Sequence, residues 1–387
     1  MCKMMERLRI VSIVWAILLS GLIVIVPLPN QVEAGTLITG DITTNTTWTL
    51  SGSPYWIDGQ IKVLEGVTLT IEPGVEVKFV PRYPFAGSSL YVYGCISAVG
   101  DSSNHIVLTS NSSDPQPGDW DVILILGHAQ LEYADVFYGN MGVVLATGNN
   151  TVFESTISHN RYHGLLISSW GRETNEIRNS TIVHNGLSGI FANMTGSATL
   201  IENSTISNNK RSGLSIYTGR AGHFIIRNNV ISFNQHHGMD LSFDTRFDIT
   251  CNGVFANDKH GIRLSFHTSN ASIHHNNVIS NVIQASDDGN SSIWDDGSEG
   301  NYWSDYEGND TDGDGIGDEP YVIDEDSQDN FPFMDPVNYC PLPTQNMPPL
   351  AVAKPDYQFA EEGSVALFYG NESYDWDGTI VNYTWDF

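Results

Sequence analysis

The sequence predicts an all-β protein built as a right-handed parallel β-helix, a solenoid of stacked coils. The first observation is a repeat, because Asn-x-x-x-Gly recurs at Asn160, Asn185, Asn209, Asn234 and Asn257 in steps of 25, 24, 25 and 23 residues. A decayed copy follows at Asn281, where Ala285 replaces the glycine. A fixed period of this size is typical of a solenoid whose units bury their apolar faces against one another.

The second observation is a set of aliphatic columns at fixed distances from each repeat asparagine. The residue three positions earlier is Ile157, Ile182, Ile206, Ile231, Val254 or Val278, and the residue eight positions earlier is Val152, Ile177, Ile201, Ile226, Ile249 or Ile273. After each glycine, apolar residues alternate with more variable ones, as in Leu165 and Ile167. This period of two predicts short strands with one inward face, three to a coil, and no segment keeps a helical period.

The regular spacing of the repeat also suggests what the asparagines and glycines do. We expect the asparagines to stack from coil to coil, and the glycines to supply a positive φ at a tight turn. A second, partial column of Asn179, Asn203 and Asn228, continued by Cys251, predicts another corner with ladder residues. A leucine-rich repeat is the alternative solenoid, but its Leu-x-x-Leu-x-Leu consensus is absent.

Residues 1–34 have the pattern of a secretory signal peptide. Lys3, Arg7 and Arg9 precede an apolar run, Ile10–Val26, and cleavage is expected after Ala34. An uncleaved membrane anchor is the alternative, since the run is near the lower length limit for spanning a bilayer. Either reading predicts a secreted or cell-surface protein.

The composition narrows the classes of partner. A net charge of −28 excludes a simple nucleic-acid binder, because few cations are available to neutralise phosphates. Besides Cys2, the chain has Cys95, Cys251 and Cys340, a set that favours packing or a single bridge over a disulfide framework or a zinc site. Eleven Asn-x-Ser/Thr sequons, among them Asn45 and Asn193, fit a glycoprotein. Asn179 and Asn203 also lie in sequons, and we expect their amides to be used in the ladder instead.

The early coils carry a first family resemblance. The stretches SPYWIDGQIKVLEGVTLTIEPGVEVKF, LYVYGCISAVG and HIVLTSNSSDPQPGDW, followed by the repeats, resemble exported archaeal and bacterial surface proteins. Those proteins carry β-helix repeats of the carbohydrate-binding/sugar-hydrolase type. The resemblance covers most of residues 36–283 and implies the fold; lyases, hydrolases, adhesins and scaffolds all use it. We therefore assign residues 35–283 to the β-helix.

Residues 284–340 form an acidic segment rich in Trp and Tyr. From Asp287 to Asp335 there are 17 Asp or Glu residues and no Lys or Arg. Asp310, Asp312, Asp314 and Asp318 alternate with glycines on one loop, and oxygen ligands at this spacing suit calcium. An empty, solvated acidic loop is the alternative. We expect this segment to close the end of the solenoid, with Trp294, Tyr302, Trp303 and Tyr306 packed over the last coil.

The same acidic segment carries a second resemblance. GNYWSDYEGNDTDGDGIGDEPYVID is similar to the C-terminal part of the periplasmic copper-binding β-helix family, whose bacterial members serve nitrous-oxide reductase maturation. Surface proteins of methane-producing archaea share this segment without a copper role. The resemblance therefore implies the fold and, more weakly, copper as a cofactor.

The C-terminal residues predict a second module. A Pro-rich linker, residues 341–349, leads to residues 350–387, which resemble the first half of a PKD-type domain, an immunoglobulin-like β-sandwich. Ser373, Tyr374, Asp375, Asp377, Gly378, Ile380, Tyr383, Trp385, Asp386 and Phe387 carry the match, and Trp376 stands where Pro is usual. We expect a truncated domain of this kind to be unstable alone, and any further anchor to lie in the missing C-terminus.

Candidate catalytic residues gather on two successive coils. His236, His237 and Asp240 lie on one coil, and Lys259, His260 and Arg263 lie on the next. Asp240 and Arg263, with His237, suit a polysaccharide lyase or hydrolase. In the alternative reading they form an exposed ion pair, worth less than about 1 kcal/mol. His237 and His260 also offer nitrogens to copper.

The favoured hypothesis is an exported, non-catalytic cell-surface protein. Its flat faces, rich in Asn, Ser and aromatic residues, would bind cell-surface glycans or neighbouring surface-layer proteins, and a PKD-type module as spacer fits that role. The alternatives are a polysaccharide lyase or hydrolase and a periplasmic-type copper-binding protein.

Overall fold

A computed structural model describes residues 35–82, 87–169, 174–193, 196, 198–218, 222–242, 245–266, 268, 270–289, 291–343, 354–355 and 368–369. The predicted signal peptide lies outside these residues, as do most of the linker and nearly all of the PKD-type segment. Within the described residues, no helix is long and apolar enough to cross a membrane.

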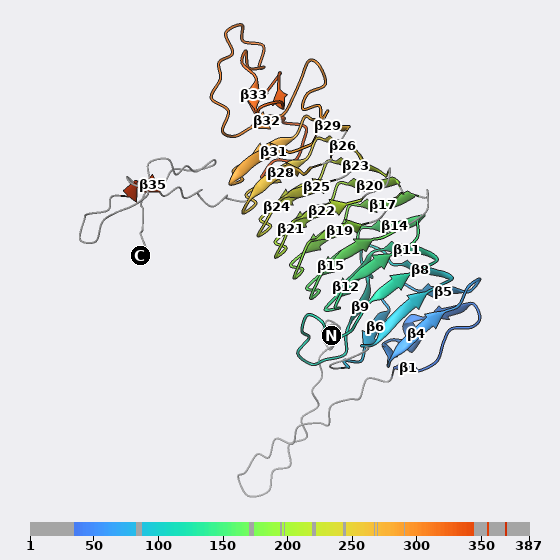
Figure 1. The fold of residues 1–387 in the computed structure, drawn as a ribbon. Coiled ribbons are helices and arrows are strands. Elements are labelled where there is room, and N and C mark those ends of the chain that lie inside the picture. Colours follow the sequence, from blue (N-terminus) through green and yellow to red (C-terminus); the bar gives the residue numbers. More distant parts are fainter. Residues whose placement is uncertain are drawn as a thin grey trace, which may run out of the picture. The chain divides into compact units, whose positions relative to one another are not determined.

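The described chain is an all-β solenoid with three parallel sheets, here named A, B and C (Figure 1). Sheet A contains β1 (Thr36–Ile38), β3 (Tyr55–Ile57), β6 (Glu76–Phe79), β9 (Ile106–Ser110), β12 (Ala134–Phe137), β15 (Thr156–Ser158), β18 (Thr181–Val183), β21 (Thr205–Ser207), β24 (Val230–Ser232), β27 (Gly253–Phe255), β30 (Asn277–Ile279) and β32 (Tyr302–Trp303). Sheet B contains β4 (Gln60–Val63), β7 (Ser89–Val92), β10 (Ile123–Ile125), β13 (Val143–Leu145), β16 (Leu165–Ile167), β19 (Ile190–Asn193), β22 (Leu214–Tyr217), β25 (Met239–Ser242), β28 (His260–Leu264) and β31 (Ile283–Asp287). Sheet C contains β2 (Thr46–Trp48), β5 (Thr68–Ile71), β8 (Cys95–Val99), β11 (His128–Glu132), β14 (Asn150–Phe153), β17 (Thr174–Arg178), β20 (Ala198–Glu202), β23 (His223–Arg227), β26 (Arg246–Thr250) and β29 (Ala271–His274).

The other elements are small. They are a 3-10 turn η1 (Leu50–Gly52) and two antiparallel pairs, β33 (Tyr321–Val322) with β34 (Gln328–Asp329) and β35 (Lys354–Pro355) with β36 (Phe368–Tyr369). The prediction of three short strands per coil is confirmed from β3 to β29, where each strand of sheet A is followed by one of sheet B and one of sheet C. The chain is thus a right-handed parallel β-helix.

The aliphatic columns predicted from the sequence form the core. Ile157, Ile182, Ile206, Ile231 and Val254 pair in register along sheet A, and each is fully buried. Equivalent columns on sheets B and C face them, so each coil buries its inward residues against the next. Because the strands alternate inward and outward residues, every second side chain points to the outer face of the solenoid.

The turn between sheets A and B contains the predicted asparagine ladder. Its six members are fully or almost fully buried, and each Nδ2 donates to the Oδ1 of the next one at 2.9–3.0 Å: Asn160, Asn185, Asn209, Asn234, Asn257 and Asn281. The expected role of the glycines was wrong, because they do not have a positive φ. A Cβ on Gly213 would lie 2.8–2.9 Å from the Gly238 carbonyl, an Ile231 methyl and the Asn234 amide, so the column needs glycine for close packing.

The positive φ lies instead on the residue before each asparagine. These residues are His159, His184, Asn208, Phe233, Ala256 and Ser280, with φ between 44° and 56°. The left-handed conformation turns the chain sharply between the two sheets, and asparagine is among the residues that tolerate it best. The turn is therefore made by one strained residue, and the next residue enters the ladder.

The second predicted ladder is displaced by one residue. Asn179, Asn203, Asn228 and Cys251 have positive φ, and Asn203 is exposed, so they are corner residues and not ladder residues. The ladder between sheets C and A consists of the following residues, Ser155, Ser180, Ser204, Asn229, Asn252, Asn276 and Asn301. The prediction that these asparagines form the ladder was therefore wrong. Asparagine suits this position because it tolerates the left-handed backbone conformation.

The solenoid continues beyond Ile283, where the sequence analysis ended it. β31 pairs with β28 on sheet B, and β32 pairs with β30 on sheet A. This part of the chain is the orange end of the stack in Figure 1. Trp294 and Trp303 are buried at this end, and Trp303 stacks on Tyr321 with ring centroids 4.4 Å apart. Residues 284–340 therefore both complete the last coil and cover it.

A single disulfide ties the covering segment to the coils. Cys251 at the corner between sheets C and A is bonded to Cys340, and Cys95 is the free cysteine among the described residues. The single bridge was one of the two roles expected for these cysteines.

Candidate functional site

The outward face of sheet B brings the predicted catalytic pair together. Asp240 on β25 and Arg263 on β28 are register partners, with Arg263 Nη1 3.1 Å from Asp240 Oδ1. Asp240 also accepts hydrogen bonds from the hydroxyls of Tyr217 and Ser265. Its side chain is 6% exposed, so the expectation of an exposed ion pair was wrong: the partners lie over the carboxylate. Burial next to Asp240 raises the pKa of the Tyr217 hydroxyl.

An aromatic strip precedes this carboxylate on the same face. His163 stacks on Phe191, with ring centroids 4.6 Å apart and planes 13° apart. The ring of Phe191 lies 6.1 Å from that of Tyr217 on the next coil. Phe191 and Tyr217 are half-buried, so part of each ring is open to solvent. The strip therefore leads from aromatic faces to the polar group around Asp240.

Cations lie along the turns that enter sheet B. Five residues occupy the same position of successive turns, and backbone hydrogen bonds join Tyr162 to Leu187, Leu187 to Arg211, and His236 to Lys259. Arg161, Lys210 and Asp258 occupy the neighbouring position of these turns, and all four Lys and Arg side chains are exposed, as is Asp258. This edge is basic in a chain whose net charge is −28.

His237 and His260 also meet on this edge. Their Nδ1 atoms lie 3.1 Å apart, and the backbone N–H of His260 donates to His237 Nδ1 at 3.3 Å. Burial lowers the pKa of His237 to about 3, and burial together with Arg263 lowers that of His260. Both imidazoles are therefore neutral at pH 7. Among the described residues, no third His, Cys, Asp or Glu ligand atom completes a group with them.

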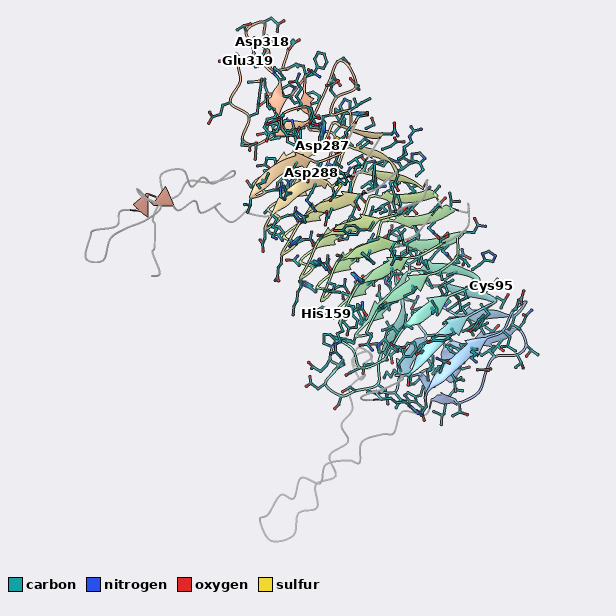
Figure 2. The ribbon with its side chains drawn as sticks, viewed as in Figure 1. Cys95, His159, Asp287, Asp288, Asp318 and Glu319 are labelled. Atoms are coloured by element: carbon teal, nitrogen blue, oxygen red, sulfur yellow. A yellow bond between two sulfur atoms is a disulfide. The ribbon has the colours of Figure 1, made fainter. Side chains whose placement is uncertain are left out.

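The acidic loop gathers three of its four predicted calcium ligands. Carboxylate oxygens of Asp310, Asp312 and Asp314 lie within 4.8 Å of one another. Asp318 instead accepts from the backbone N–H and the hydroxyl of Thr311, and so closes the loop. Hydrogen bonds from Gly315 and its neighbours lower the pKa of Asp310. In Figure 2, Asp318 and Glu319 lie on this loop, away from Asp287 and Asp288 at the end of β31.

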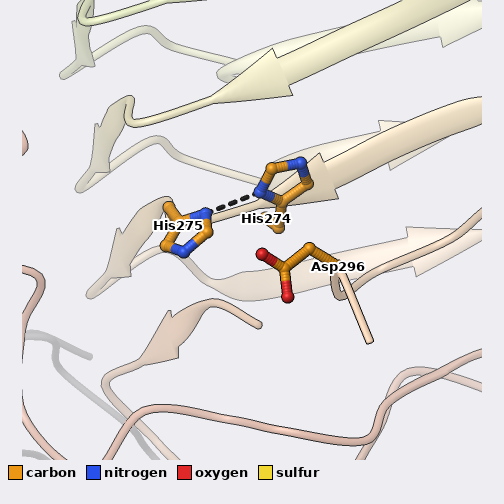
Figure 3. A group of neighbouring side chains, drawn as sticks. All are labelled: His274, His275 and Asp296. Carbon is orange, nitrogen blue, oxygen red and sulfur yellow. Dashed lines mark hydrogen bonds between the residues drawn. The ribbon is translucent and has the colours of Figure 1, made fainter. Parts of the chain in front are cut away.

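A further cluster was missed by the sequence analysis. His274, His275 and Asp296 offer ligand atoms that all lie within 4.8 Å of one another (Figure 3). The only sequence evidence was a His-His pair that ends a strand one coil after Cys251, followed by Asp295-Asp296. The sequence does not show where the corner lies. Strand alternation alone therefore predicts that one histidine points inward and the other outward.

Taken together, these features define a parallel β-helix protein with polar outer faces. The sequence places it further: residues 99–308 match the family described as periplasmic copper-binding protein (NosD), and the chain belongs to that family. The expected location was secreted or cell-surface, and the description of the family as periplasmic is consistent with a periplasmic or extracellular protein.

Other similarities are shorter or structural. The chain is 39% identical over 74 residues to Protein bark beetle of Drosophila melanogaster, which is 19% of this chain and 2% of that protein. Pectate lyase Pel9A matches at 14% identity and a TM-score of 0.41, covering 62% of this chain and 66% of its own. The A-module of the Azotobacter vinelandii mannuronan C-5 epimerase AlgE6 matches at 18% identity and a TM-score of 0.32, covering 67% of this chain and 89% of its own. These structural matches concern the fold alone.

Proposed function

We propose that this protein is an exported, non-catalytic β-helix protein of the cell surface that binds glycans along the outer face of sheet B. The observation that supports it most is the strip of Phe191 and Tyr217 rings next to the buried Asp240 and Arg263. Sugars need such a combination, because their apolar faces pack on aromatic rings while fixed polar groups bind their hydroxyls. The disulfide also fits a protein that functions outside the cytoplasm.

The charge distribution favours an acidic glycan. Arg161, Lys210, Arg211 and Lys259 are exposed along the edge where the strip begins. Guanidinium groups bind carboxylates and sulfates with paired hydrogen bonds. A basic edge on an acidic protein directs an anionic ligand to that edge. A neighbouring surface-layer protein is the other partner to be tested.

Binding to glycan panels tests the proposal. We expect the full chain to bind an acidic polysaccharide such as polygalacturonate or alginate more tightly than dextran, with an affinity that falls as salt increases. Phe191→Ala and Arg211→Ala should each weaken binding about tenfold, the size of one lost contact of 1–2 kcal/mol. Arg246→Ala, at an exposed position on sheet C, is the control. Equal binding by all three variants, or retention of a surface-layer protein but no glycan, would contradict the proposal.

A polysaccharide lyase or hydrolase is the second candidate, supported by the burial of Asp240 between Arg263 and Tyr217. In a lyase, a base removes the proton next to the sugar carboxylate, and the glycosidic oxygen leaves to give an unsaturated product. Ultraviolet absorbance during incubation with an acidic polysaccharide measures that product. Product formation that Asp240→Asn abolishes would replace the non-catalytic proposal.

Calcium is proposed as a structural ion of the acidic loop. Asp310, Asp312 and Asp314 supply hard oxygen ligands, and Asp318 holds the loop closed. Calcium should raise the unfolding temperature above its value in EGTA, and Asp312→Asn should reduce the rise. An equal unfolding temperature with calcium and with EGTA would leave a solvated loop.

Copper at His237 and His260 is not supported by their geometry. Copper(II) needs several nitrogen or oxygen ligands in a tetragonal arrangement, and among the described residues no His, Cys, Asp or Glu adds a third ligand atom to His237 and His260. These two residues fit a buried imidazole pair better than a metal centre.

A further inference from the structure

The corner between sheets C and A turns two consecutive imidazoles to the same side. Successive residues of a strand point to opposite faces. His275, however, has a φ of 59°, so the chain bends there and brings its Nδ1 to 2.6 Å from that of His274. On earlier coils the same corner position holds Asn179, Asn203, Asn228 and Cys251. All these coils share the left-handed backbone at the corner, but only the coil of His275 places an imidazole there.

Glu299 fixes the orientation of His275. Its Oε2 lies 2.7 Å from His275 Nε2, so this nitrogen carries the proton and donates it to the carboxylate. His275 Nδ1 then has a lone pair, which accepts the Nδ1–H of His274 in the metal-free protein. A carboxylate behind an imidazole is the usual second partner of a metal-bound histidine, because it sets the tautomer and strengthens the ligand.

Asp296 brings a carboxylate oxygen to the same place. Its Oδ1 accepts from the backbone N–H groups of Ser298 and Glu299 and from the Ser298 hydroxyl. Its Oδ2 makes no hydrogen bond within the described part of the chain. These bonds also lower the pKa of Asp296, so the group is anionic at neutral pH. The carboxylate is thus held rigidly by one oxygen and presents the other.

The covering segment holds this corner in place. The rings of Phe333 and Tyr339 lie 5.8 and 6.3 Å from the His275 ring. The disulfide of Cys251, on the preceding coil, joins the same segment at Cys340. His274 and His275 are half-buried and Asp296 is exposed, so an ion can enter from solvent.

We propose that His274 Nδ1, His275 Nδ1 and a carboxylate oxygen of Asp296 bind one divalent transition-metal ion. Two imidazoles and one carboxylate suit zinc(II) or copper(II), whereas calcium prefers oxygen ligands alone. On binding, the proton of His274 moves from Nδ1 to Nε2, so that both Nδ1 atoms face the metal. Three protein ligands leave a further position for water, as in exchangeable sites.

The test is a titration of the full chain with zinc(II) and copper(II), with calcium as a comparison. Calorimetry should give one tight transition-metal site, and electron paramagnetic resonance of the copper form should show coupling to two nitrogens. The variants use residues of the same columns, so that the fold is kept: His275→Asn, as at Asn228, and His274→Thr, as at Thr250. Each should weaken binding at least tenfold, and Glu299→Gln should weaken it 10–100-fold through His275.

Two controls separate this site from others. His223→Ser changes a histidine of sheet C that pairs with Asp248, and His237→Ser changes the buried pair of sheet B; both variants should bind as the unchanged protein does. Binding unchanged in His274→Thr and His275→Asn would overturn the proposal, as would loss of binding only in His237→Ser. The glycan strip lies on sheet B, away from this corner. His275→Asn should therefore weaken metal binding and leave glycan binding unchanged, so the two proposals can fail independently.

Discussion

The repeated coils and the C-terminal cover, residues 284–340, use the same hydrogen bonds in different ways. In the coils each asparagine amide donates to the next one, so every rung is both donor and acceptor. The cover supplies the acceptors that end both ladders: Asn281 donates to Gln284 Oε1, and Asn301 donates to Asp329 Oδ2. A ladder of amides that all donate toward the C-terminus leaves its last donors unpaired unless an acceptor ends it. A buried carboxylate is well suited to that role, because when ionised it only accepts.

The difference shows why the cover looks so unlike the repeat. Asp329 is buried and accepts from the backbone N–H of Asn301, the indole of Trp303 and the N–H of Phe331. Burial outweighs these bonds and raises the pKa of Asp329 to about 6. A carboxylate terminator thus carries a desolvation cost that an amide does not, and only one of the two ladders ends on a carboxylate.

The largest effect is expected at this terminator. Asp329→Ala leaves the N–H groups of Asn301 and Trp303 buried, and that of Phe331 half-buried, without this acceptor, and should cost about 4 kcal/mol at 1–3 kcal/mol for each group. Urea denaturation measures this free energy of unfolding. Asp326→Ala, an exposed carboxylate of the same segment, should change it by less than about 0.5 kcal/mol. A loss of similar size in both variants would mean that Asp329 does not end the ladder.

A smaller loss is expected inside the coils, and it should differ between the two corners. Asn209 accepts from the N and Nδ2 of Asn185 and donates to Asn234 and Ile182, so Asn209→Ala should cost about 3 kcal/mol. The Ser204 hydroxyl on the same coil accepts from the Ser180 backbone N–H and donates to the Glu202 carbonyl, so Ser204→Ala should cost about 1.5 kcal/mol. Equal losses would show that the asparagine ladder adds nothing to the serine one.

Counted for one residue and one pH unit, the smallest effect separates the coils from the cover by pH. Burial lowers the pKa of His163 to about 4 and that of His237 to about 3, below the usual 6.5. Below pH 6.5 the unfolded chain therefore binds more protons, so stability from these residues is complete above pH 6.5 and declines toward pH 3. Each histidine should contribute a slope of up to about 1.4 kcal/mol per pH unit.

Serines from the same column provide the test, because Ser188 and Ser212 occupy equivalent positions. The double variant His163→Ser, His237→Ser should lose less stability between pH 6.5 and 5 than the unchanged protein. Asp329 works in the opposite direction, since its raised pKa makes the cover more stable as the pH falls from 6 to 4. Parallel stability curves for the double variant and the unchanged protein would exclude the histidines as the source of acid sensitivity.

Some features of the site could be read from the sequence and others could not. The columns placed Asp240 next to Arg263 and His237 next to His260 correctly, because residues that share a repeat position are register partners in a parallel sheet. Exposure was not predictable in the same way. Asp240 was expected on the surface, and it is covered because Tyr217 and Ser265 reach it from neighbouring positions.

The sequence by itself determined the solenoid, its three-strand coil and its buried columns, because period and alternation are local properties that repeat. Only the tertiary structure decided which residue of each corner takes the left-handed conformation. That choice put Asn179 outside the ladder and His275 beside His274. The tertiary structure also brought Asp296, Glu299 and Asp329 into contact with the last coils. These three residues lie in an irregular segment that follows the repeats. Irregular segments have no period to read, so their contacts follow from the closure of the last coil.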